Sequence, residues 1–199
     1  MSLVVLLSGL SWGTVVTATT PAGELHLAGQ LVKARCALCH GLEGQSVSPL
    51  YPKLAGQSAE YLVKQLFNFK TGQRPSTAMK EMTENLSASD IRSLAEYFSR
   101  QPTQAQQTAD MELAAVGRYI YFRGNPYAGV SACVSCHGVY ATGSAQMPRL
   151  AGQHASYIEA QLNNFRRHLR VNDQAMHSVV AAMTELEIKA VAQYLSSQE

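Results

Sequence analysis

Apolar residues along this chain recur three and four positions apart, the spacing that places side chains on one face of a helix. One such stripe in the first half consists of Leu27, Leu31, Val32 and Ala34. A matching stripe in the second half consists of Leu113, Val116, Tyr119, Ile120 and Phe122. No segment alternates apolar and polar residues as a half-buried strand does. The pattern therefore predicts an all-α fold.

Two further helices are predicted in each half. The middle helices begin near Ser58 and near Ala155, and the apolar face of each consists of Tyr61, Leu62, Leu66 and Phe69 in the first, and Tyr157, Ile158, Leu162 and Phe165 in the second. The last helices begin with the capping boxes Ser87-x-x-Asp90 and Thr184-x-x-Glu187, in which the hydroxyl accepts a hydrogen bond from an otherwise unpaired backbone N–H. We expect about three or four helices per half.

The two halves are copies of one sequence unit. Two C-x-x-C-H motifs, at 36–40 and 133–137, lie 97 residues apart, and the segments PKLAGQ (52–57) and PRLAGQ (148–153) follow at an offset of 96. An internal repeat of this length predicts two copies of one domain. We place the N-terminal domain at 23–101, a polar linker at 102–109 and the C-terminal domain at 110–199.

Residues 1–22 are predicted to be a signal peptide or leader, because an uncharged stretch of apolar and small residues from Leu3 to Val16 precedes a run of small residues. A basic n-region and a clear A-x-A site are missing. A retained anchor is the alternative, but roughly 14 such residues fall short of the ~20 that span a bilayer. Export predicts a periplasmic location.

Composition limits the classes of function. Apolar residues make up 46% of the chain and charged residues 15%, which is typical of a globular protein. The net charge of +2 gives no argument for a nucleic-acid or membrane-surface partner. The closest basic cluster, Arg166, Arg167 and Arg170, is predicted to lie on a solvated helix face.

All four cysteines lie in the two C-x-x-C pairs, and a histidine follows each pair. A disulfide scaffold would spread more cysteines over a shorter chain, and structural zinc would need the two pairs to converge. C-x-x-C-H is instead the signature of c-type haem attachment. We therefore predict two covalently bound haem c groups, with thioether bonds to Cys36, Cys39, Cys133 and Cys136 and with His40 and His137 as iron ligands.

The repeat also selects the second iron ligand. Met79 follows His40 by 39 residues, and Met176 follows His137 by the same 39. Met82, Met147 and Met183 have no methionine at the equivalent position, and we expect Met82 and Met183 to fill the core. A thioether ligand closes the iron site and suits electron transfer. Ligation by His177 is the alternative, although Lys80 is its counterpart in the first half.

A ligating histidine normally donates its other ring N–H to a carbonyl. Pro52 lies 12 residues after His40 and Pro148 lies 11 after His137, so their carbonyls are the candidates. Leu54 and Leu150 are expected to pack on the haem face. Alternatively, each proline serves only as a turn element.

Together the two haem motifs, the repeated P-[KR]-L-A-G-Q segment and the methionines resemble the cytochrome c4 family. The resemblance covers about residues 24 to 198 and implies two class I cytochrome c domains about a pseudo-twofold axis. It implies a periplasmic carrier, soluble or loosely associated with the membrane, that takes electrons from a quinol-oxidising complex to a terminal oxidase or reductase. It also suggests that the first and last helices cross where Gly29 meets Tyr97 and where Gly117 meets Tyr194.

Two other functions remain open at this point. The chain could be the dihaem subunit of an enzyme such as flavocytochrome c sulfide dehydrogenase, or a haem peroxidase, whose iron must open. Two closed His/Met irons leave no vacant position for a substrate, so we expect an electron-transfer protein rather than an enzyme.

The ligand assignment leads to a prediction. Met79→His or Met176→His should lower the reduction potential of that haem alone, because a thioether favours Fe(II) more than an imidazole does. Redox titration with spectral resolution of the two haems measures this. An unchanged potential at the mutated haem would show that the assignment is wrong.

Overall fold

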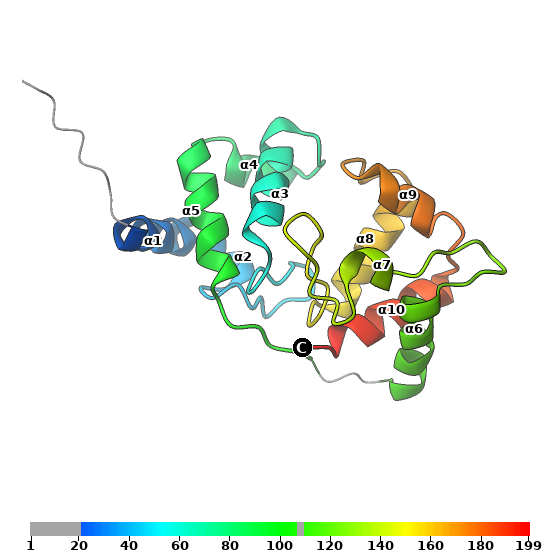
Figure 1. Ribbon diagram of the computed structural model, residues 1–199. Helices are drawn as coiled ribbons and strands as arrows, with labels where there is room; N and C mark the ends of the chain where they lie inside the picture. The colour runs from blue at the N-terminus through cyan, green and yellow to red at the C-terminus, as the bar shows by residue number, and fades with distance from the viewer. Residues whose placement is uncertain (1–20, 107–109) are drawn as a thin grey trace, which may run out of the picture.

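Two sets of helices follow one another along the chain and form the two halves of the molecule (Figure 1). The computed structural model describes residues 21–106 and 110–199. The first half contains α1 (Pro21–Leu31), a π-helix η1 (Val32–Cys36), α2 (Ala37–His40), α3 (Ala59–Thr71), α4 (Thr77–Thr83) and α5 (Ala88–Ser99). The second half contains α6 (Met111–Arg123), α7 (Val134–His137), α8 (Ala155–Arg166), α9 (Gln174–Val180) and α10 (Glu185–Ser196).

The all-α prediction is confirmed, since the described residues form no strand and only one isolated bridge, between Asn125 and Val130. Each half has more helices than expected, because the haem motifs and the methionine segments form short helices of their own. Their four to seven residues are too few for an amphipathic pattern to appear in the sequence.

Each half has its own core between its first, middle and last helices. In the first half α5 packs against α1 and α3, and in the second half α10 packs against α6 and α8. Both predicted capping boxes are present: Ser87 Oγ accepts from the Asp90 N–H at 3.1 Å, and Thr184 Oγ1 accepts from the Glu187 N–H at 3.2 Å. Each box fixes where the last helix begins and so aligns its apolar face with the core.

The buried face of the first helix in each half differs from the predicted stripe. Of the predicted stripe, Leu27 and Ala34 are exposed and Val32 is buried as expected, and Ala28 is buried as well. In α6, Val116 and Tyr119 are exposed, while the buried face contains Ala114, Gly117, Ile120 and Tyr121. The reason is the helix crossing: α1 meets α5 at Gly29 and Tyr97, and α6 meets α10 at Gly117. Close approach of two backbones requires small side chains at the contact.

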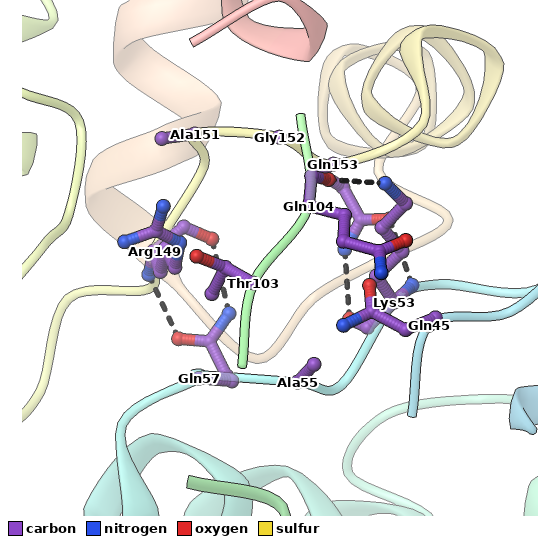
Figure 2. Close-up of a pocket in the computed structure, with 10 residues that line it drawn as sticks. All are labelled: Gln45, Lys53, Ala55, Gln57, Thr103, Gln104, Arg149, Ala151, Gly152 and Gln153. Atoms are coloured by element: carbon purple, nitrogen blue, oxygen red, sulfur yellow. Dashed lines mark hydrogen bonds between the residues drawn. The ribbon is translucent and has the colours of Figure 1, made fainter. Parts of the chain in front are cut away.

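The repeated glutamines join the two halves. Gln57 Oε1 accepts from the Arg149 N–H at 2.8 Å, and its Nε2 donates to the Arg149 carbonyl at 3.0 Å. Gln153 makes the same two bonds with Lys53, both at 2.9 Å (Figure 2). A side-chain amide carries the same donor and acceptor as a peptide group, so each glutamine pairs with the other half as a second backbone would. The two pairs relate the halves by a pseudo-twofold axis.

The predicted linker takes part in this junction. Residues 103 and 104 pass between the two LAGQ loops (Figure 2). Lys53 Nζ donates to the Gln104 carbonyl at 2.6 Å, Gln45 Nε2 donates to the Pro102 carbonyl, and the Gln106 N–H donates to Ser196 O at 3.0 Å. The segment is therefore held by both halves. Its residues 107–109 lie outside the described residues, and the domain limits stay predictions.

The predicted leader falls almost wholly outside the described residues, which begin with α1 at Pro21. Its assignment stays a prediction. Across residues 21–106 and 110–199, none of the helices has the length and apolar character needed to cross a membrane.

The two helix crossings give a matched pair of substitutions. A Cβ added at Gly117 would overlap the Ala190 carbonyl, whereas one added at Gly29 would meet Tyr97 Cε2 at an ordinary 3.6 Å. Gly117→Ala should therefore destabilise the protein by about 1–3 kcal/mol. Gly29→Ala should be neutral or stabilising by up to ~1 kcal/mol, since alanine favours helix. Chemical denaturation measures both; equal effects would contradict the crossing geometry.

The glutamine junction gives a second prediction. Gln57→Ala removes both partners of the Arg149 backbone at a buried position and should cost about 1–3 kcal/mol of unfolding free energy. The control Gln73→Ala changes an exposed side chain and should change the unfolding free energy by less than ~0.5 kcal/mol. Thermal denaturation of the haem-loaded protein compares the two. Equal stability of the two variants would show that the junction contributes little.

Candidate functional site

Each C-x-x-C-H motif ends in a short helix, and its histidine is more deeply buried than its cysteines. His40 and His137 are buried, Cys36, Cys39 and Cys133 are half-buried, and Cys136 is exposed. Gly41 and Gly138 end these helices with φ of 76° and 78°, a conformation that costs glycine little. The chain can thereby leave the helix directly after each histidine.

None of the four cysteines forms a disulfide, so all four sulfur atoms are available for the thioether bonds of two haems. Cys36 and Leu54 pack against the buried core of the first half, and Cys133 and Leu150 against that of the second. Burial raises the pKa of the Cys36 and Cys133 thiols to about 11, so both are protonated at neutral pH. A thioether is uncharged as well and suits the same apolar surroundings.

The hydrogen bond predicted for each histidine is present. His40 Nδ1 donates to the Pro52 carbonyl at 2.9 Å, and His137 Nδ1 donates to the Pro148 carbonyl at 3.3 Å. With the proton on Nδ1, the lone pair is on Nε2, the nitrogen available to a metal. Burial lowers the pKa of both histidines, and the carbonyl bonds oppose this only in part. Both imidazoles are therefore held neutral, as metal ligation requires.

The two methionines occupy equivalent places. Met79 is the third residue of α4 and Met176 the third of α9, and both are half-buried. Met176 packs against the same core as Cys133 and Leu150. Their ligation of iron remains a prediction.

Of the two methionines that were predicted to fill the core, only one is buried. Met183 is buried as predicted, but Met82 is 39% exposed, so its assignment to the core was wrong. The short helix α4 buries the neighbouring Thr83 instead. His177 is buried, and its Nδ1 lies 2.7 Å from the Phe165 carbonyl.

Two buried arginines form a network that the sequence did not predict. Arg74 and Arg170 are each 8% exposed, and Arg170 belongs to the cluster that we expected in solvent. Arg74 lies above the ring of Phe69 and Arg170 above that of Phe165, both at 4.5 Å. The two side chains thus have the same place in the two halves, each between its middle helix and its methionine helix.

Each arginine crosses to the other half. Arg74 donates to Tyr157 Oη at 2.8 Å and to Gln161 Oε1 at 2.9 Å, both on α8. Arg170 donates to Tyr61 Oη at 2.9 Å and to Gln65 Oε1 at 3.2 Å, both on α3. Within the part of the chain that the structure describes, every hydrogen-bond partner found for the two guanidinium groups is neutral. The two positive charges thus suit a cofactor that brings carboxylates, as haem does.

His154 is a further contact between the halves. Its Nε2 donates to the Ser46 carbonyl at 2.8 Å, while Nδ1 accepts from Gln106 Nε2 at 3.0 Å. Burial lowers its pKa, the Ser46 bond opposes this, and the charge of Lys53 adds to it. At the equivalent position Ser58 Oγ donates to the Ala145 carbonyl at 2.7 Å. The two residue types differ, so the repeat did not reveal this contact.

Comparison with known proteins agrees with this geometry. A family model described as cytochrome c matches residues 27–121 and 123–199. The chain is 44% identical over 166 residues to a cytochrome c4 of Thiocapsa roseopersicina, covering 80% of this chain and 85% of the relative. It is 38% identical over 172 residues to a thiosulfate dehydrogenase electron acceptor of Thiomonas intermedia, covering 83% and 79%.

Among solved structures, reduced recombinant cytochrome c4 from Pseudomonas stutzeri superposes with a TM-score of 0.83 at 34% identity, covering 88% of this chain and 98% of that one. These matches agree with the two haem motifs and with the two histidines held by proline carbonyls. They also agree with the two buried arginines, whose charges suit the carboxylates of haem. The chain therefore belongs to the dihaem cytochrome c4 family, as an electron-transfer protein with two covalently bound haem c groups rather than an enzyme.

Proposed function

We propose that the protein is a periplasmic one-electron carrier that accepts electrons from a quinol-oxidising complex and passes them to a terminal oxidase or reductase. The observation that carries this proposal is the equivalence of the two sites: each half has a buried histidine fixed by a proline carbonyl. Each also has a half-buried methionine at the same helical position. With Met79 and Met176 as ligands, both irons are closed to substrate.

The surface around the haem motifs supports exchange with partners. Leu38, between the two cysteines of the first motif, is 97% exposed, and Cys136 of the second is exposed as well. These exposed residues lie within the motifs that would attach the two haems, where a partner protein could make contact. When bound, each haem supplies a one-electron Fe(III)/Fe(II) couple. The chain orients the two imidazoles, and the haems would be attached beside the apolar cores against which Cys36 and Cys133 pack.

A second candidate is an electron acceptor for thiosulfate dehydrogenase. It is favoured by the Thiomonas intermedia relative, whose name states that role. The same two haems would serve, and only the donor would differ. A third candidate is the permanent dihaem subunit of a flavoprotein dehydrogenase. It differs from the two carrier functions because its partner stays bound.

The donor can be tested with the haem-loaded protein. We expect a purified quinol-oxidising complex with quinol to reduce both haems, and a terminal oxidase to reoxidise them. Stopped-flow absorbance at the haem bands measures both steps, and quinol without the complex is the control. Reduction by thiosulfate dehydrogenase with thiosulfate, and not by the quinol-oxidising complex, would favour the second candidate.

Size-exclusion chromatography of native extracts, with periplasmic fractions analysed separately, tests the remaining parts of the proposal. Stoichiometric co-elution with a flavoprotein would exclude a free carrier, and recovery only in the cytoplasmic fraction would exclude the location.

A further inference from the structure

We propose that Arg74 and Arg170 form a single anion site between the two halves, shared by the propionate carboxylates of both haems, and that each arginine helps to set the potential of both haems. This inference requires the two haems but is independent of any donor or acceptor. It assigns a role to the two most deeply buried arginines among the described residues.

Within residues 21–106 and 110–199, no carboxylate is found among the hydrogen-bond partners of these two arginines. Gln65 Oε1 accepts from Arg74 Nη1 at 2.8 Å and from Arg170 Nη2 at 3.2 Å, so one amide oxygen joins both cations. Gln161 Oε1 accepts from both as well, at 2.9 and 3.0 Å. An arginine does not lose its proton in a protein. Two adjacent buried cations with neutral partners are unfavourable unless an anion lies beside them.

Carboxylates are the anions that fit these two arginines. The ion pairs of the described residues are formed by Lys64, Arg100 and Arg166, and none includes these two arginines. Guanidinium groups bind carboxylates through paired hydrogen bonds, and the neighbouring phenols of Tyr61 and Tyr157 are further donors. Each haem brings two propionates of its own. Arg74 precedes Met79 by five residues and Arg170 precedes Met176 by six, so both lie on the segments that lead to the proposed iron ligands.

Each arginine makes contacts in both halves of the molecule. Arg74 stacks on Phe69 of its own half but donates to Tyr157 and Gln161 of the other. Arg170 stacks on Phe165 and donates to Tyr61 and Gln65. Neither cation therefore belongs to one half alone. A nearby positive charge favours Fe(II) over Fe(III), because reduction lowers the positive charge on the iron. Loss of either arginine should lower both potentials.

The test is a spectrally resolved redox titration of haem-loaded Arg74→Gln and Arg170→Gln. Each variant should lower both potentials, with at least a tenfold change in each reduction equilibrium, which is 59 mV for a one-electron couple. Arg92→Gln and Arg167→Gln remove exposed arginines from the two halves and should leave both potentials unchanged. Unchanged potentials in Arg74→Gln, or a shift confined to one haem, would overturn the shared site.

Two further measurements keep the proposal testable if a glutamine variant does not fold. Arg74→Lys keeps the charge but loses the paired donors, so the potentials should stay near those of the wild type. The propionate bending bands in the resonance Raman spectrum should shift for both haems. Wild-type potentials should also be insensitive to added phosphate at constant ionic strength. Unshifted propionate bands, or potentials that follow the phosphate concentration, would mean that a different anion neutralises the arginines.

These readouts are equilibrium properties of the isolated protein. Failure to react with a quinol-oxidising complex or an oxidase would overturn the proposed function and leave this inference intact. Unchanged potentials in the arginine variants would overturn this inference and leave the proposed function intact.

Discussion

The pairing of each LAGQ glutamine with the backbone of the other half is the interaction on which the arrangement of this molecule depends. It uses the residue directly after the proline whose carbonyl holds the buried histidine of the haem motif: Pro52 accepts from His40, and the next residue, Lys53, pairs with Gln153. Leu54 then packs into the core, and Gln57 pairs with Arg149 of the other half. One six-residue segment thus orients the imidazole, supports the core and joins the halves. The junction and the histidine are therefore held by neighbouring residues of one segment.

The two halves share this plan without being identical. The His137 bond to its carbonyl is longer than that of His40, 3.3 against 2.9 Å. His154 and Ser58 make equivalent cross-contacts with different chemistry, and the first helix approaches the last more closely at Gly117 than at Gly29. Because a bond to the ligating histidine tunes its basicity, such differences give the two haems different surroundings.

Local features of this protein were predictable from the sequence, and contacts between the halves were not. The haem motifs, the capping boxes and the proline carbonyls depend on residues that are near each other in the chain, so spacing alone placed them. The burial of Arg170 depends on Tyr61 and Gln65, which are more than 100 residues away, and a basic cluster on a helix end gave no sign of it. The exposed Val116 and Tyr119 were misplaced for a related reason. A hydropathy pattern ranks large side chains as buried, whereas a close helix crossing at Gly117 selects small ones.

The crossed arginines also bear on why the two copies are held in one chain. Separated from the other copy, each half would lose the tyrosine and the glutamine of that copy that accept from its own arginine. A hydrogen bond to a charged group contributes about 1.5–3 kcal/mol, a large fraction of the stability of a domain of this size. Two non-covalently associated copies would also have to offset the entropy of association, which the covalent link through residues 102–109 largely removes. In the proposed anion site, each haem therefore has a cation from the other copy beside it, and the single chain makes this arrangement independent of concentration.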